Sequence, residues 1–443
     1  MNRPLALLLA LLAVHFAYVL RHFEHVLITD EFYYVGKARA IVAHGGLVRA
    51  DPPAIAVERG ETWGTSDWRP QGYPLLLAAV SLGNFDHPAH TLRLRMTILQ
   101  FLLVAAVLVH AFLLSPRTWH SALIFGLPPW TFAFVNELGP DSVNVAVAWV
   151  ALLLLWRYVQ EPSAGRLLVA TFVFSLALFI RPEMIAMPPL LVGIALLMRF
   201  RRTPLGALLR HAVVAAMVWS ALVGVQAAYH TWATGQRGIF GGLHITNAGA
   251  FAWANNWWGT EKETYDFVYA LTEAREMQLP ERAFDTAQER AEVMRVITRV
   301  RQRGSFTAED DAVFARLAVE KKRAHPVRSV VLRAWHAWNM WFNTEHNNPL
   351  LEAMAAVPRM VRLPVWGALL LLRWLIIALA LVAFFHAWRQ RDPISLLIVL
   401  LCAYALVRTA FVGGVLNWNV HRYVLSAWPP VLCCACMFWR KRA

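Results

Sequence analysis

Ten long apolar segments constrain the fold of this chain more than any other feature of its sequence. They lie at 4–20, 92–114, 118–135, 142–158, 167–180, 184–199, 211–230, 364–387, 394–412 and 423–439. A helix needs roughly 20 apolar residues to cross the hydrocarbon core of a bilayer. Because 58% of the 443 residues are hydrophobic and only 16% are charged, a water-soluble fold is excluded. The sequence predicts an all-α polytopic membrane protein with about ten transmembrane helices.

The net charge of +14 follows from the expected topology. If the N-terminus is cytoplasmic, the cytoplasmic loops and ends contain two acids, Glu161 and Asp392. Their basic residues are Arg3, Arg117, Arg157, Arg166, Arg199, Arg201, Arg202, Arg210, Arg389, Arg391, Arg440, Lys441 and Arg442. This distribution is the positive-inside pattern of membrane proteins, so the charge requires no nucleic-acid partner. We expect a multi-pass protein of the inner (cytoplasmic) membrane with both termini in the cytoplasm.

Two hydrophilic regions are then extracytoplasmic. The first, 21–91, belongs to an N-terminal transmembrane module (1–230) and contains in-plane helices, including the apolar stretch 74–82, which is too short to cross a bilayer. The second, 231–363, is expected to form a small, mainly helical domain, followed by C-terminal transmembrane helices (364–443). Its surface helices are expected at 265–277, 282–303 and 307–323.

Two short patterns add detail to the second region. Thr307 with Asp310 three residues later is typical of a helix capping box. Trp335, Trp338 and Trp341 recur every three residues, which favours an interfacial helix over a surface that stacks on sugars. The four cysteines (Cys402, Cys433, Cys434 and Cys436) all lie in apolar segments, so neither a disulfide nor a zinc site is predicted.

Acidic residues follow the first and third apolar segments. Asp30 and Glu31 are either a helix cap with a first-turn acid, or a carboxylate that takes a proton from an acceptor hydroxyl at the membrane surface. Glu137 and Asp141 are turn and cap residues when taken alone. Together with Asp30 they could instead hold a divalent cation such as Mg²⁺ or Mn²⁺, or position a sugar or an acceptor.

Cations occur on the same face. Arg181 and Glu183, on either side of Pro182, interrupt one long apolar run. They are either a snorkelling ion pair or residues that position substrate. His421, Arg422 and Tyr423 close the last outer loop, where a guanidinium suits an anionic phosphate. Arg69, before Pro70, is a second candidate for binding that phosphate.

The order of these motifs resembles a known family. One span is followed by the outer acids at 30–31, a Trp-Arg-Pro segment leading into an in-plane helix, an Arg-Pro-Glu hairpin, a long outer region and a final outer Arg-Tyr. This order is similar to that of polytopic glycosyltransferases of the GT-C fold, such as lipid A aminoarabinose transferases and protein O-mannosyltransferases. The Asn- and Gly-rich stretch 246–259 and the stretch 318–341 resemble parts of the family's outer region.

The resemblance implies a transferase that uses a polyprenyl-phosphate-linked sugar. Asp30 would be the general base, with Glu31 beside it. Arg422, with His421, Tyr423 and Arg69, would hold the donor phosphate. The sugar would pass with inversion to a lipid, glycan or protein acceptor on the extracytoplasmic face. Arg69 departs from the family pattern, because Arg-Pro-Gln replaces a basic residue before a double proline.

Three other functions remain open on the sequence. An O-antigen ligase or polymerase would also use outer arginines and a histidine, which His421 and Arg422 supply, but Asp30-Glu31 suits it less well. A transporter of a lipid-linked sugar predicts internal repeats and paired broken helices, which the sequence does not show. A scaffold leaves the outer acids and arginines unexplained.

Overall fold

The computed structural model describes residues 3–21, 30–47, 70–234, 248–257, 277–342, 358–415 and 421–439, apart from single positions within them, together with 263, 267, 270 and 271. Within these residues all regular structure is helical, and no strand occurs. The chain divides into two compact units. The membrane unit comprises Met1–Ile239, Asn347–Arg408 and Arg422–Ala443, and the polar unit comprises Phe240–His346 and Thr409–His421.

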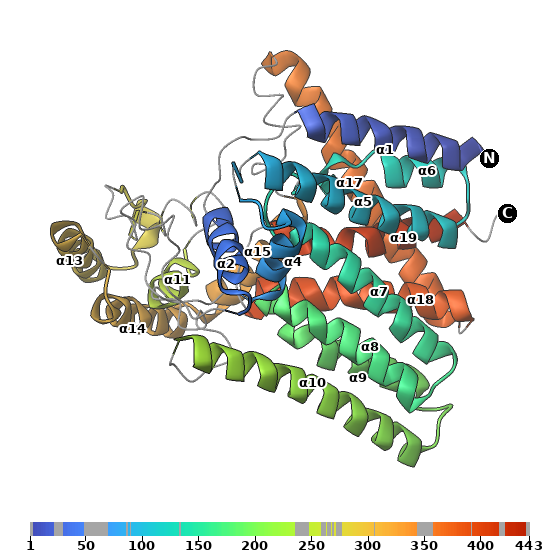
Figure 1. Ribbon diagram of the computed structural model, residues 1–443. Coiled ribbons are helices and arrows are strands. Elements are labelled where there is room, and N and C mark those ends of the chain that lie inside the picture. Colours follow the sequence, from blue (N-terminus) through green and yellow to red (C-terminus); the bar gives the residue numbers. More distant parts are fainter. Residues whose placement is uncertain are drawn as a thin grey trace. The chain divides into compact units, whose positions relative to one another are not determined.

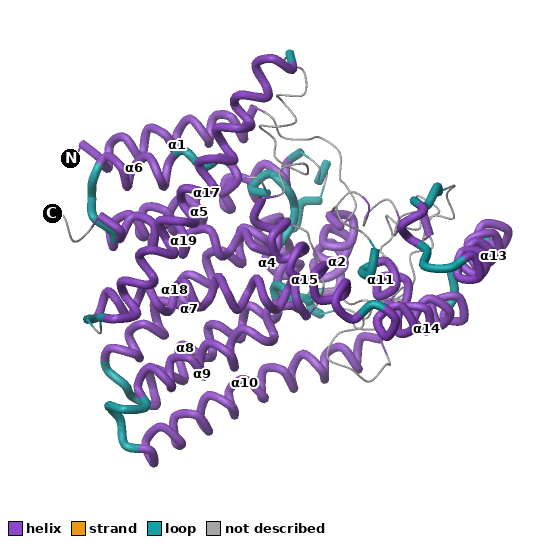
Figure 2. Tube along the Cα trace, turned by 180° about the vertical axis from the view of Figure 1, so that it is seen from behind, coloured by secondary structure: helices purple, strands orange, loops and turns teal. Residues whose placement is uncertain are grey.

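Seven helical segments of the membrane unit are long and apolar enough to cross a bilayer. They are α1 (Arg3–Arg21), α5 (Thr91–Leu114), α7 (Asp141–Gln160), η3 with α9 (Pro182–Ala186 and Met187–Arg199), α10 (Leu205–Thr234), α17 (Arg359–Arg389) and α18 (Pro393–Thr409). Figures 1 and 2 show these helices lying side by side. The expected all-α membrane fold is therefore confirmed.

The remaining three expected spans are shorter or broken. The segment 118–135 forms α6 (Trp119–Gly126) and the 3₁₀ turn η1 (Pro129–Phe132), because Pro128 and Pro129 cannot continue the helix. The segment 167–180 forms α8 (Ala164–Leu176) and η2 (Ala177–Phe179). The segment 423–439 forms η8 (His421–Ala427) and α19 (Trp428–Met437). Hydropathy located the helices, whereas backbone breaks reduce the number that are long enough to cross.

Two short helices lie at one end of this bundle, α2 (Asp30–His44) and α4 (Gly72–Ser81). This end is opposite to the one where α1 begins and α19 ends (Figure 1). Tyr34 of α2 meets Tyr73 of α4 edge to face at 5.1 Å, and both are in the core that joins these helices to α5. A Cβ on Gly72 would lie 2.5 Å from the carbonyl oxygen of Phe179, so this glycine lets α4 begin against η2.

The polar unit is built from α11 (Ala248–Ala254), η5 (Glu281–Ala283), α13 (Ala287–Arg303), α14 (Ala308–Ala324), α15 (Pro326–Phe342) and the π-helical turn η7 (Ala410–Val415). Trp253, Phe267 and Phe314 lie at the centre of its core. The expected helices 282–303 and 307–323 correspond to α13 and α14, and the Thr307–Asp310 capping box is confirmed. The expected helix 265–277 falls mostly outside the described residues.

The three tryptophans of α15 do not share one environment. Trp335 and Trp338 are exposed, at 49% and 42%. Trp341 is half-buried and donates a hydrogen bond of 2.9 Å from Nε1 to Oγ1 of Thr409. The interfacial position predicted for all three therefore fits the surroundings of Trp335 and Trp338 better than those of Trp341.

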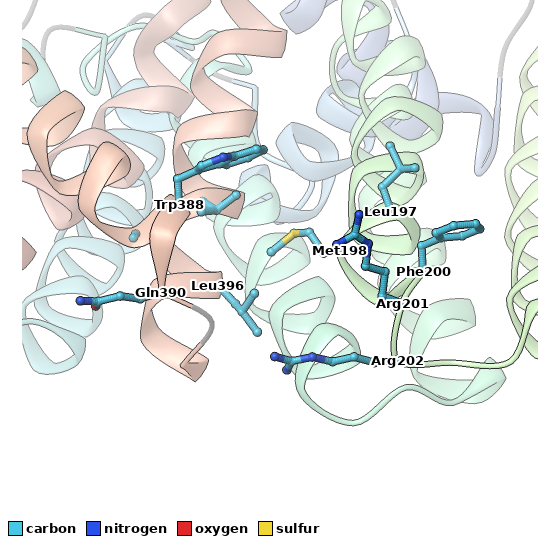
Figure 3. A pocket seen from close by; sticks show the side chains of 10 residues that line it. Leu197, Met198, Phe200, Arg201, Arg202, Trp388, Gln390 and Leu396 are labelled. Carbon is cyan, nitrogen blue, oxygen red and sulfur yellow. The ribbon is translucent and has the colours of Figure 1, made fainter.

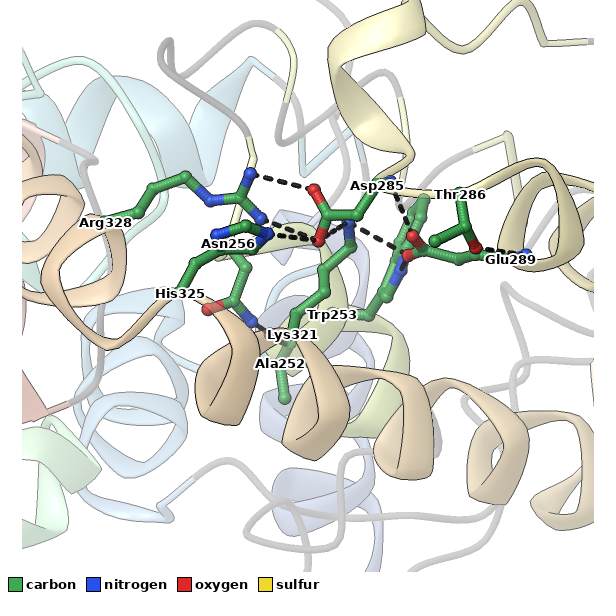
Figure 4. A network of polar contacts seen from close by, with 9 residues as sticks. All are labelled: Ala252, Trp253, Asn256, Asp285, Thr286, Glu289, Lys321, His325 and Arg328. Carbon is green, nitrogen blue, oxygen red and sulfur yellow. Dashed lines mark hydrogen bonds and ion pairs between the residues drawn. The ribbon is translucent and has the colours of Figure 1, made fainter.

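A polar cluster joins α13, α14 and α15 (Figure 4). Lys321 lies 3.0 Å from both the Asp285 and Glu289 carboxylates, and Arg328 donates two hydrogen bonds to Asp285. Glu289 also accepts a hydrogen bond of 2.6 Å from Trp253 Nε1. We call Asp285, Glu289, Lys321 and Arg328 the polar-unit cluster.

Candidate functional site

The end of the membrane unit that carries α2 and α4 gathers most of the residues predicted to act chemically. Asp30 is the first residue of α2, and His421 and Arg422 begin η8, although the side chains of these three lie outside the described residues. Arg69 lies outside them entirely. The geometry of the site therefore comes from the acids and arginines on the neighbouring segments.

Glu31 ties α2 to the turn that precedes α7. Its Oε2 accepts a hydrogen bond of 2.5 Å from Nη2 of Arg93, and its Oε1 accepts one of 2.8 Å from the backbone N–H of Leu138. Arg93 also donates from Nη1 to the Asn136 carbonyl oxygen at 3.0 Å. Because Glu31 and Arg93 are only 3% and 1% exposed, this is a desolvated ion pair that fixes the start of α2.

A second network of buried ion pairs contains Arg181 and Glu183. Asp141, the first residue of α7, forms an ion pair with Arg181. The Nε of Arg181 lies 2.6 Å from Oε1 of Glu183, and Nη2 of Arg408 lies 3.1 Å from the same oxygen. All four side chains are buried. The network links the starts of α7 and η3 to the end of α18.

The same network holds the start of η8. The Nε of Arg408 donates a hydrogen bond of 2.8 Å to the Tyr423 carbonyl oxygen. The guanidinium of Arg181 lies over the Tyr423 ring, 4.6 Å from its centroid. Tyr423 is thereby fixed through both its backbone and its ring. The residue before it, Arg422, is thereby brought to the same end of the membrane unit.

Tyr73 lies between the two networks. Its side chain is completely buried, and its hydroxyl has no hydrogen-bond partner within the described part of the chain. Burial raises the pKa of Tyr73, and the nearby groups Glu31, Tyr34, Asp141 and Glu137 raise it further. The hydroxyl therefore stays protonated among acidic groups.

Glu137 lies on the turn that Glu31 and Arg93 hold. It is half-buried, and its carbonyl oxygen accepts a hydrogen bond of 2.8 Å from Nε2 of Gln100. A second bond from this amide, to the Val135 carbonyl oxygen, fixes the other side of the turn. The backbone of Glu137 is thus set by α5.

Three carboxylates of this site are already neutralised. Glu31 is paired with Arg93, Asp141 with Arg181, and Glu183 with both Arg181 and Arg408. We call these six residues the membrane cluster. A divalent cation held by Asp30, Glu137 and Asp141 would compete with Arg181 for the Asp141 carboxylate, so the fit of Asp141 as a cation ligand is poor. The described residues contain no group of three His, Cys, Asp or Glu side chains that could hold a metal ion.

Three members of the site were not singled out from the sequence. Arg93 and Arg408 lie inside the expected spans 92–114 and 394–412, where an arginine is itself a signal for a buried polar partner. Tyr73 gave no such signal, because a tyrosine beside an apolar stretch is usually an interfacial residue. Its position between acidic groups depends on how α4 packs.

Comparisons with known proteins add the following. No protein-family model matches the sequence, and a search of curated proteins found no match. Among solved structures, the chain is similar to the archaeal oligosaccharyltransferase AglB from Archaeoglobus fulgidus in complex with an inhibitory peptide and a dolichol-phosphate. The TM-score is 0.48 and the identity 10%, over 97% of this chain and 50% of that one. It is also similar to ArnT from Cupriavidus metallidurans bound to undecaprenyl phosphate, with a TM-score of 0.36 and 14% identity over 95% and 77% of the two chains. This chain thus spans half the length of the AglB chain.

Proposed function

We propose that the chain is a membrane glycosyltransferase that moves a sugar from a polyprenyl-phosphate-linked donor to an acceptor on the extracytoplasmic face. One observation carries the proposal. A single end of the membrane unit gathers the start of α2 with Asp30, the turn with Glu137, and the part of η8 that begins with Arg422. An acid that can act as a base and a cation suited to a phosphate are the two groups that this transfer needs.

The general base is Asp30. Three other acids of the site, Glu31, Asp141 and Glu183, each already bind a guanidinium. Glu31 is therefore a positioning residue. It anchors the first turn of α2 to Leu138 and Arg93, and so fixes the backbone of its neighbour Asp30.

The donor phosphate is held by Arg422, assisted by His421. Arginine binds phosphate through two parallel hydrogen bonds. Arg408 and Arg181 fix Tyr423, the next residue along, and so set the backbone from which Arg422 extends. Arg69 is a further candidate for the same phosphate.

The reaction is one displacement with inversion at the anomeric carbon. Asp30 takes the proton of the acceptor nucleophile as its heavy atom bonds to the anomeric carbon. The bond between that carbon and the phosphate oxygen breaks with its electron pair, and polyprenyl phosphate leaves with its charge neutralised by Arg422. The acceptor is a lipid, a glycan or a protein.

The proposal is tested by mass spectrometry of envelope glycolipids, glycans and glycoproteins. Three strains are compared: one with the wild-type chain, one with the gene deleted, and one with the deletion complemented by Asp30→Asn at equal expression. A single-sugar mass increment present in the first strain should be lost in the second. In the third it should fall about 10²-fold or more, as expected for loss of a general base.

Asp392→Asn is the matched control, because Asp392 is an exposed acid that caps α18 at the other end of the membrane unit. This variant should keep the mass increment. An increment that survives Asp30→Asn but not the deletion rejects Asp30 as the base and favours transport of a lipid-linked sugar or a ligase that uses His421 and Arg422. Full activity after chelation of divalent cations would reject a required metal at Asp30 and Glu137.

A further inference from the structure

A cavity of about 290 Å³ lies at the other end of the membrane unit, where α9 ends and α17 is followed by α18 (Figure 3). Arg201 and Arg202 line it after the end of α9, and Trp388 and Gln390 line it at the end of α17. Arg181 directly precedes the η3–α9 segment at the candidate site, and Arg199 ends the segment. The cavity is therefore separated from the candidate site by the length of that segment.

The polar part of the cavity is positively charged. Arg201 and Arg202 are exposed, and no carboxylate in the described part of the chain lies within ion-pair distance of either guanidinium. None of the residues that line the cavity is acidic. At the same end of the unit, by contrast, Arg166 is paired with Glu161 at 2.5 Å. The two arginines thus face the cavity without an acidic partner among the described residues.

The rest of the wall is apolar. Leu197, Phe200 and Trp388 are 73%, 59% and 67% exposed, and Leu396 of α18 completes the surface between the two helix pairs. In Figure 3 the side chain of Arg202 extends toward Leu396. A site with apolar walls and a cationic end has the polarity of a lipid chain joined to an anionic headgroup.

We propose that this cavity binds the phosphate of an anionic glycerophospholipid of the cytoplasmic leaflet. Guanidinium groups bind phosphate oxygens in pairs. Basic pockets between transmembrane helices on the cytoplasmic side are suited to anionic headgroups, and Trp388 lies where an aromatic ring is favourable at headgroup depth. The apolar wall selects a lipid over a free phosphate ion. The lipid bridges the α9–α10 turn to the α17–α18 turn.

The test uses the full-length protein in detergent micelles and native mass spectrometry. Phosphatidylglycerol and phosphatidylcholine are titrated separately against the wild type and the double variant R201Q/R202Q. The wild type should retain one phosphatidylglycerol more tightly than phosphatidylcholine. The double variant should bind phosphatidylglycerol about tenfold or more weakly, because charge-assisted hydrogen bonds are lost.

Two further variants separate this site from general surface charge. R117Q/R210Q removes the same charge from exposed positions at the same end that do not line the cavity, and should leave retention unchanged. Leu396→Trp places a larger side chain in the cavity, and it should weaken phosphatidylglycerol binding without a change in charge. Equal retention by R201Q/R202Q and wild type, or equal loss in R117Q/R210Q, overturns the proposal. Competition by inorganic phosphate as strong as that by the lipid overturns it as well.

Discussion

The membrane cluster and the polar-unit cluster both combine acids with cations, but they differ in access to water. Every residue of the membrane cluster is at most 7% exposed. In the polar-unit cluster the Lys321 side chain is 2% exposed, whereas that of Arg328 is 35% exposed. Removing one partner of a fully buried pair leaves a charge that water cannot reach, but at an exposed pair water replaces the partner. Substitutions in the two clusters should therefore lower the free energy of unfolding by very different amounts, although the clusters contain similar residue types.

The largest effect is expected for Arg408→Leu. This change leaves three buried carboxylates against two guanidinium groups in the membrane cluster and frees the Tyr423 carbonyl oxygen, so it should destabilise the protein by about 3–5 kcal/mol. The measurement is the unfolding midpoint in detergent micelles. Arg389→Leu, at an exposed position of α17, is the control and should change stability little. Equal midpoints for the two variants would show that the membrane cluster is not a stabilising network.

An intermediate effect is expected for Lys321→Met. Asp285 and Glu289 would lose the cation that lies 3.0 Å from both, but Asp285 would keep Arg328. We expect about 2–3 kcal/mol, below the range for an uncompensated charge that is fully buried, because the Asp285 side chain is 19% exposed and water can reach it. Hydrogen exchange of the amides of α13 and α14 in the full chain would report it. Exchange in these helices at the wild-type rate would contradict the assignment of Lys321 as the centre of the cluster.

The smallest effect is expected for Arg328→Gln, about 0.2–1 kcal/mol at neutral pH, because its side chain is partly exposed. The loss of stability caused by Arg328→Gln should also depend on pH. Burial raises the pKa of Asp285, but hydrogen bonds from Arg328 and Lys321 outweigh this effect, so its pKa lies below the usual value.

The sign of the pH dependence follows from this direction. The unfolded-state pKa of an aspartate is about 3.9. The stabilisation that the ion pairs of Asp285 give the folded protein is therefore fully present above that pH. It is lost as the pH falls through the lower folded-state pKa of Asp285. Exchange rates of α13 in wild type and Arg328→Gln should differ at pH 7 and converge in acid. A difference that grows in acid would mean that Arg328 acts through another group.

The helical membrane fold follows from the sequence because hydrophobic segments need no knowledge of their neighbours to be recognised. The positions at which helices break within the apolar segments are harder to predict from the sequence. Pro128 and Pro129 mark the end of α6, and Pro429 and Pro430 mark the start of α19, but the short length of α8 and the 3₁₀ conformation of η2 and η8 carry no comparable signal in their apolar runs. Their backbone conformations depend on what each segment packs against, so the hydropathy profile overstates the number of full-length spans.

The sequence by itself determined which residues carry charge near one membrane face, including Glu31, Asp141, Arg181 and Glu183. Only the tertiary structure decided their partners. Arg93 is 62 residues from Glu31, and Arg408 is 225 residues from Glu183, so no local pattern links them. The packing of the helices then determines which acid pairs with which arginine, because a carboxylate that is removed from water needs a cation close to it. The physical reason is that charge is a property of the residue, whereas pairing and desolvation are properties of the packed helices.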